Sequence, residues 1–191
     1  MTTKENEVSH VLGLDISTTT TGWCVIDRSE KCLLSLGFFD LSDCESDFSK
    51  ADVVEQGLDA ISARFNVVDV FIEENLQAFQ PGKSSAATIV KLARFNGTVS
   101  HMCYKTFKFE PTFLNVNTAR KSVGFKADKS IPGPVKDQVR DWVIERLPDV
   151  EWPTHVLKSG PNKGKTVYEK CCGDMSDAYV IAKAGSLKSK K

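Results

Sequence analysis

The feature that most constrains this chain is the run VLGLDISTTTTGWCVID at residues 11–27. It predicts a buried strand over 11–16, a turn rich in Ser and Thr, and a returning strand over 21–28. Asp15 falls where the apolar residues of the first strand end. A buried carboxylate is costly unless its charge is compensated, and hard cations favour carboxylate oxygens as ligands. The alternative is that Asp15 only caps the turn, as Asp commonly does.

Length and composition predict a single domain over 1–191, because 191 residues with 41% apolar content can build a real core. No apolar run reaches the roughly 18 residues that span a bilayer, and the N-terminus lacks a signal-peptide core. We therefore expect a cytoplasmic protein with no membrane partner. Six cysteines form no two CxxC pairs, which argues against structural zinc and predicts reduced thiols.

The formal net charge of zero conceals an asymmetry along the chain. Residues 1–95 carry 8 Lys/Arg against 15 Asp/Glu, a net charge of −7, and residues 96–191 carry 17 against 10, a net charge of +7. An acidic half beside a basic half fits a metal site next to a surface that binds a polyanion. Chance clustering of solvated charge is the alternative.

The order of apolar patterns predicts an α/β fold. Three strands over 11–16, 21–28 and 31–41 form an antiparallel meander. Next come a helix over 50–65, a strand over 67–74, a helix over 82–104 and a strand over 113–116. Three helices end the chain: a short one capped by Thr118 and ending at Gly124, one over 134–147, and one over 173–187 that ends near Gly185. This alternation predicts a mixed sheet with helices on both faces.

Three segments are expected to lie outside this core. They are a polar N-terminal arm at 1–9, a basic insertion at 154–170 and a basic C-terminal tail at 186–191. The insertion contains two glycines and a proline, and it predicts either a hairpin or a mobile loop that projects from the body. The apolar side of 82–104 is our candidate for a dimer interface.

Four acids distant in the sequence are expected to converge. Asp15 and Glu73 end two buried strands, and Asp174 and Asp177 share one face of the last helix. We prefer Glu73 to Glu74 because side chains alternate along a strand. The two aspartates could instead only complement the helix dipole. Clustered carboxylates repel one another unless divalent cations neutralise them, and two such ions would make a site that hydrolyses phosphodiesters.

Five blocks carry a family resemblance: LGLDISTTTTGWCVID, IEENL, TARKSVGF, GPVKDQV and DMSDAYVIA. In this order and spacing, the chain resembles the RuvC-type Holliday-junction resolvases of the RNase H-like superfamily from about residue 11 to 185. The resemblance implies a five-stranded mixed sheet ordered 3-2-1-4-5 with strand 2 antiparallel. It also implies a homodimer that binds branched DNA and nicks two opposed strands of a four-way junction with Mg²⁺, or alternatively Mn²⁺.

The resemblance also implies roles for individual residues. The four acids Asp15, Glu73, Asp174 and Asp177 match the metal-binding, catalytic positions. Lys136 and Lys121 match basic positions that contact the DNA backbone near the scissile phosphate, and Lys136 would also offset negative charge in the transition state. The other expected phosphate contacts are Arg120, Lys126, Lys129, Lys163 and Lys165, which would make DNA affinity fall steeply with salt.

Two features differ from the bacterial members of this family. Their aromatic residue three positions after the strand-four acid is replaced by Leu76, with Phe79 further on, and the basic loop is longer. Both favour a phage-encoded or otherwise divergent member. Its location would be the bacterial cytosol and nucleoid, or the host cytoplasm if it is phage-encoded.

Other functions remain open at this stage. A related nuclease could act on flaps, forks or RNA–DNA hybrids with the same metal chemistry. An actin-like or sugar-kinase-type ATPase also has an acid and small residues after its first strand, although that fold needs a second domain and a further Gly-rich loop. A non-catalytic DNA-binding protein could keep the scaffold, but it would have no physical reason to cluster four acids.

Overall fold

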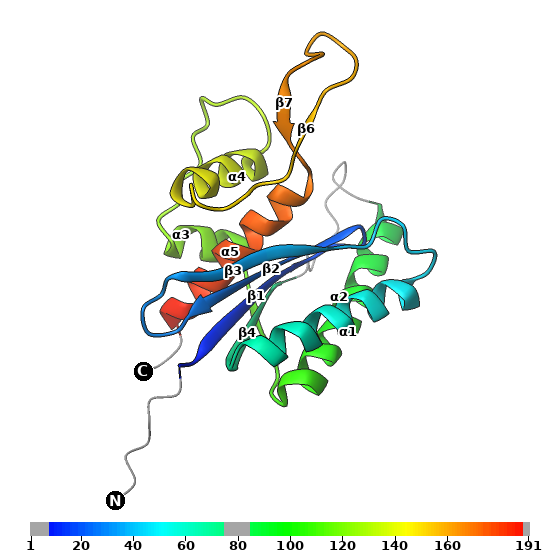
Figure 1. The fold of residues 1–191 in the computed structure, drawn as a ribbon, viewed down its shortest axis with the longest axis vertical. Coiled ribbons are helices and arrows are strands. Elements are labelled where there is room, and N and C mark those ends of the chain that lie inside the picture. Colours follow the sequence, from blue (N-terminus) through cyan, green and yellow to red (C-terminus); the bar gives the residue numbers. More distant parts are fainter. Residues whose placement is uncertain (1–7, 75–84, 189–191) are drawn as a thin grey trace, which may run out of the picture.

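The computed structural model describes residues 8–74 and 85–188. Its centre is a five-stranded sheet ordered β3-β2-β1-β4-β5, which confirms the expected order (Figure 1). The strands are β1 (His10–Ile16), β2 (Thr20–Asp27), β3 (Leu33–Asp40), β4 (Val67–Glu73) and β5 (Thr112–Leu114). Strand β2 runs antiparallel to β1 and β3, whereas β1, β4 and β5 are parallel. Leu76 and Phe79 lie outside the described residues.

Helices cover both faces of the sheet, as the alternation predicts (Figure 1). Helices α1 (Asp47–Arg64) and α2 (Ala86–Phe107) pack on one face, and α3 (Val116–Ser122), α4 (Val135–Arg146) and α5 (Cys171–Lys188) pack on the other. None of the helices in the described part of the chain is long and apolar enough to cross a membrane. All six cysteines are free thiols.

Alternation along β1 and β4 decides which layer each side chain meets. Leu12 and Leu14 belong to the core beneath α1 and α2, whereas Val11 belongs to the core beneath α3, α4 and α5. Asp15 has the same parity as Val11, and Glu73 has the same parity as Phe71, which also packs beneath α5. The two acids therefore leave the sheet on the α5 side.

Helix α5 lies directly on the backbone of β1 and β2, and two glycines make this approach possible. A Cβ atom at Gly13 would lie 2.4 Å from the backbone nitrogen of Ala182, and one at Gly22 would lie 2.1 Å from the carbonyl oxygen of Asp174. Both distances are much shorter than a van der Waals contact, so only glycine fits at either position. The contact at Gly22 fixes the first turn of α5, which carries Asp174, over the sheet edge where β1 ends.

Among the helix boundaries that differ from the predictions, two concern residues expected to cap or end a helix. Helix α3 begins at Val116, because the side chain of Asn115 accepts hydrogen bonds from the backbone of Asn117 and Thr118 at 3.1 and 3.2 Å; Thr118 is therefore not the cap. Helix α5 continues to Lys188 instead of ending near Gly185. Gly185 lies inside the helix, where the Phe71 ring occupies the space a Cβ would need. Residues 186–188 of the predicted tail are thus helical.

The basic insertion forms a hairpin, which decides between the two expected conformations. Strands β6 (Thr154–Val156) and β7 (Thr166–Tyr168) are antiparallel, with Thr154 opposite Tyr168. The hairpin projects beyond α4 and α5, and its chain leads directly into α5 (Figure 1). Its base is thereby tied to the element that carries Asp174 and Asp177.

The glycine contacts predict opposite effects of alanine at two positions. Gly22→Ala should destabilise the fold by roughly 1–3 kcal/mol or more, because the new methyl group meets backbone and not a flexible side chain. Gly97→Ala, in α2, is the matched control, since a Cβ there meets nothing within 4 Å and alanine favours helix by about 1 kcal/mol. Urea unfolding measures both. Equal stability of Gly22→Ala and wild type would mean that α5 does not approach β2 this closely.

Candidate metal centre

Three acids from three elements converge at the end of the sheet. Carboxylate oxygens of Asp15, Glu73 and Asp177 all lie within 4.8 Å of one another. Strands β1 and β4 are parallel neighbours in register, with Leu14 opposite Ile72, so their carboxyl ends place Asp15 and Glu73 side by side. Asp177 reaches the same point from α5, where its side chain is only 3% exposed. The predicted convergence is therefore present for these three residues.

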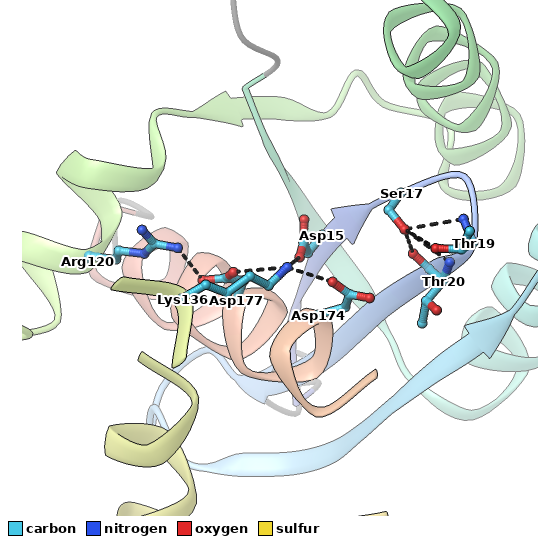
Figure 2. Close-up of polar contacts among 8 residues, drawn as sticks. All are labelled: Asp15, Ser17, Thr19, Thr20, Arg120, Lys136, Asp174 and Asp177. Carbon is cyan, nitrogen blue, oxygen red and sulfur yellow. Dashed lines mark hydrogen bonds and ion pairs between the residues drawn. The ribbon is translucent and has the colours of Figure 1, made fainter. Parts of the chain in front are cut away.

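Asp174, the fourth predicted acid, lies beside the cluster and is held by a lysine. The Nζ atom of Lys136, from the first turn of α4, lies 2.7 Å from Asp174 Oδ1. The same nitrogen lies 3.4 Å from Asp15 Oδ2 and 3.6 Å from Asp177 Oδ2. Figure 2 shows the lysine side chain extended between the carboxylates that surround it. Lys136 therefore lies among the acids of this centre.

Arg120, which was expected to contact a DNA phosphate, is mostly buried and pairs with Asp177. Its Nη2 donates to Asp177 Oδ1 at 2.8 Å, and the two side chains are only 15% and 3% exposed (Figure 2). Its Nε atom is buried without a hydrogen-bond partner among the described residues. A buried, charge-assisted pair of this kind orients the carboxylate. Arg120 is thus part of the acidic centre, where it also lines the cleft with a side chain that is mostly buried.

Burial and mutual repulsion perturb the acids of this centre. Burial raises the pKa of Asp15 well above its usual range, and Glu73, Asp177 and Asp174 raise it further, although Lys136 opposes them. Burial also raises the pKa of Glu73, to which Asp177 adds, and that of Asp174. Burial disfavours the charge on Lys136, yet its carboxylate neighbours together raise its pKa. Four carboxylates thus share two cationic side chains, which leaves the centre with excess negative charge.

The acids line a cleft of about 560 Å³ at this edge of the sheet. Asn96 and Leu92 from α2 and Val116 from α3 form other parts of its wall. Glu74 also borders the cleft. Strand β4 ends at Glu73, so the alternation of side chains along the strand no longer directs Glu74 away from this side. The prediction that Glu73 is the member of the cluster is supported by its oxygen distances.

Solved structures were compared with the chain as a whole. RuvC of T. thermophilus in complex with a Holliday junction substrate aligns with a TM-score of 0.61 and 15% identity, covering 92% of this chain and 91% of that one. A second structure of Thermus thermophilus RuvC gives 0.58 and 17%, covering 92% of each chain. The yeast mitochondrial Holliday junction resolvase Ydc2 gives 0.56 and 17%, covering 94% of this chain and 78% of that one. No family model and no curated protein matches the sequence.

The chain has the RuvC fold. The likeness extends over nearly the whole chain, and it agrees with the strand order that the RuvC-type resemblance implies.

The remaining predicted DNA contacts are exposed lysines on one layer of this RuvC fold. Lys121 lies on α3, Lys126 and Lys129 follow in the loop before α4, and Lys163 and Lys165 lie in the hairpin loop. This is also the layer that supplies Lys136. Their exposure leaves these side chains accessible to a polyanion.

The residues that shape the turn after Asp15 were not among those predicted from the sequence. Ser17 Oγ accepts from the backbone nitrogen of Thr20 at 3.0 Å and donates to the Thr20 carbonyl oxygen at 2.6 Å (Figure 2). The buried Lys50, from the first turn of α1, donates its Nζ to the carbonyl oxygen of Thr18. The Ser/Thr composition indicates a turn of this kind, but no sequence pattern connects it with Lys50, 32 residues away.

The donor set fits a hard divalent cation. Asp15, Glu73 and Asp177 offer only carboxylate oxygens, which are the ligands that Mg²⁺ and Mn²⁺ favour, and the cluster carries negative charge that a cation would neutralise.

The perturbed Asp15 predicts a stability change that depends on pH. Because its pKa is raised in the folded state, its ionisation costs the fold free energy at neutral pH and nothing below the ordinary value of 3.8. In EDTA at pH 7, Asp15→Asn should raise the melting temperature by roughly 2–4 °C, the shift that about 1 kcal/mol produces in a domain of this size. The gain should disappear as the pH approaches 3.8.

The exposed Asp52→Asn on α1 is the control for this measurement and should change the melting temperature little at either pH. Added Mg²⁺ should stabilise wild type and Asp52→Asn more than Asp15→Asn. A melting temperature of Asp15→Asn below that of wild type at pH 7 would contradict the electrostatic account.

Proposed function

We propose that this protein is a metal-dependent DNA endonuclease, a crossover junction endodeoxyribonuclease that resolves four-way junctions by paired nicks. The single observation that carries the proposal is the convergence of Asp15, Glu73 and Asp177 at the end of β1 and β4. Its context supports it, because the RuvC fold covers the chain and one structure of that fold is a complex with a Holliday junction substrate. Branched DNA is therefore the proposed substrate.

Four acids, Asp15, Glu73, Asp174 and Asp177, are the proposed ligands of Mg²⁺ or Mn²⁺. When bound, such ions supply a water of lowered pKa for attack on phosphorus and stabilise charge on the departing 3′ oxygen. Arg120 would keep the Asp177 carboxylate oriented, since their hydrogen bond is buried. Lys136 has a side chain that is 46% exposed at the mouth of the cluster, where it would offset negative charge on a phosphate that enters the cleft.

The exposed lysines of the α3, α4 and hairpin layer are proposed to hold the DNA backbone. They are Lys121, Lys126, Lys129, Lys163 and Lys165. Contacts to phosphates carry no base sequence, so selection would come from the shape of the junction. Affinity that depends on such contacts falls steeply with salt.

A homodimer is proposed because a two-fold assembly matches a two-fold junction and allows two symmetric nicks. The first half of α2 supports this, since Val90 is 58% exposed and Ile89 and Leu92 are only partly covered in one protomer. We place the protein in the cytoplasm, where it would meet DNA.

The catalytic claim predicts a separation of binding from cutting. Asp15→Asn should abolish nicking of a synthetic four-way junction in Mg²⁺ while junction binding survives or tightens, because one negative charge is removed beside the phosphate. Gel assays on a junction, a flap, a fork and linear duplex measure both properties. Asp52→Asn should cut like wild type. Undiminished cutting by Asp15→Asn would remove Asp15 from the reaction, and preferential cutting of flaps or forks by wild type would assign another branched substrate.

The hairpin claim predicts a change in salt dependence. Lys163→Ala combined with Lys165→Ala should weaken junction binding and reduce the slope of log affinity against log salt by up to about 2, because each lost phosphate contact contributes roughly 0.9. Lys105→Ala, an exposed substitution in α2 on the opposite layer, is the control. An unchanged slope in the double variant would exclude the hairpin loop from the DNA contact.

A further inference from the structure

A second cavity, of about 350 Å³, adjoins the acidic cleft. The two share Ser17, Lys136 and Asp174, so they are continuous at the centre that would cut DNA. The second cavity extends away from that centre along α4 and reaches the base of the hairpin, where Tyr168 and Lys170 form its wall. Its volume is at the lower end of the range typical of small-molecule sites.

The cavity wall contains an aromatic ring whose orientation is fixed. The guanidinium carbon of Arg140 lies 5.9 Å from the centre of the Tyr168 ring, in cation–π range. Arg140 is itself held by two hydrogen bonds, from Nε to Asp141 at 2.8 Å and from Nη1 to Asp137 at 3.1 Å. Tyr168 nevertheless remains 40% exposed. A large, partly exposed ring beside a held guanidinium offers a surface for base stacking.

The charges around the cavity argue against a simple anion site. Lys136, Arg140 and Lys170 are balanced by three acids on the same wall, Asp137, Glu169 and Asp174. A ligand with a flat uncharged ring and one adjacent anionic group matches this arrangement better than a free phosphate does. Hydroxyl groups of Ser17 and Thr19 complete the lining. A nucleotide has this chemistry.

We propose that this cavity binds the nucleotide next to the scissile phosphate, with its base stacked on Tyr168. The inference rests on the proposed function and adds to it the path of one DNA strand. A base can stack on Tyr168 only after it has left the stack of its own helix, so the site would favour strands that are already distorted, as at a branch point. The hairpin would then select DNA with unpaired nucleotides. It would show no base preference, because every base has a π-face.

A fluorescent base tests this proposal. 2-Aminopurine, whose fluorescence falls on stacking, is placed in a four-way junction at the position before the nick or at the position after it. Binding is followed in the Asp15→Asn protein in EDTA, so that no cutting occurs. At one position the base should exchange its stack in the junction for the Tyr168 ring, so its fluorescence should stay quenched on binding. Adding Tyr168→Ala should abolish this quenching and weaken binding by roughly 5- to 160-fold, the range for losing one base–aromatic stack.

Two further variants make the result specific. Tyr168→Phe should keep the quenching, because the ring and not the hydroxyl forms the platform. Phe48→Ala removes an exposed aromatic ring, 85% exposed, from α1 on the opposite layer and should change nothing. Quenching that persists in Tyr168→Ala, or quenching at no position, overturns this inference while the nuclease proposal stands. A wild-type protein that neither binds nor nicks the junction overturns both.

Discussion

The direct contact of α5 with the backbone of β1 and β2 is the constraint on which the rest of the structure depends. Gly13 and Gly22 leave no side chain between helix and sheet, so the first turns of α5 lie over the end of β1. Side chains alternate along a strand, so Asp15 and Glu73 point to the side of the sheet that α5 covers, and Asp177 of α5 lies next to them. Position in the fold, and not proximity in sequence, thus assembles the cluster.

This arrangement sets an electrostatic cost that the protein reduces only in part. Burial and repulsion raise the pKa of Asp15, Glu73 and Asp174, although Arg120 and Lys136 contribute two positive charges. Arg120 is buried and binds Asp177 in a fixed geometry, whereas Lys136 is half-exposed and touches three acids. Arg120 is therefore suited to orient the Asp177 carboxylate, whereas Lys136 is free enough to move toward an incoming substrate. A centre that retains excess negative charge is destabilising for the fold and suited to binding divalent cations.

Much of this could be predicted because the decisive signals are local. Apolar runs ending in Asp15 and Glu73 mark where strands emerge, and the spacing of Asp174 and Asp177 places both on one helix face. The strand order followed from the family resemblance, and the structure bears it out, whereas the glycine and proline positions left a hairpin and a mobile loop both open. The sequence could not reveal that Arg120 is buried against Asp177 or that Lys50 supports the turn at Thr18, because both contacts join distant segments. The role of Gly185 was hidden for the same reason, because its missing side chain makes room for the Phe71 ring and does not end the helix.

The most direct test of the central claim is X-ray diffraction from crystals soaked in Mn²⁺, recorded where manganese scatters anomalously. We expect an anomalous peak bounded by carboxylate oxygens of Asp15, Glu73 and Asp177, with Lys136 displaced from at least one of its acidic partners. Peaks found only at surface carboxylates elsewhere, with the cluster unchanged at saturating Mn²⁺, would contradict it.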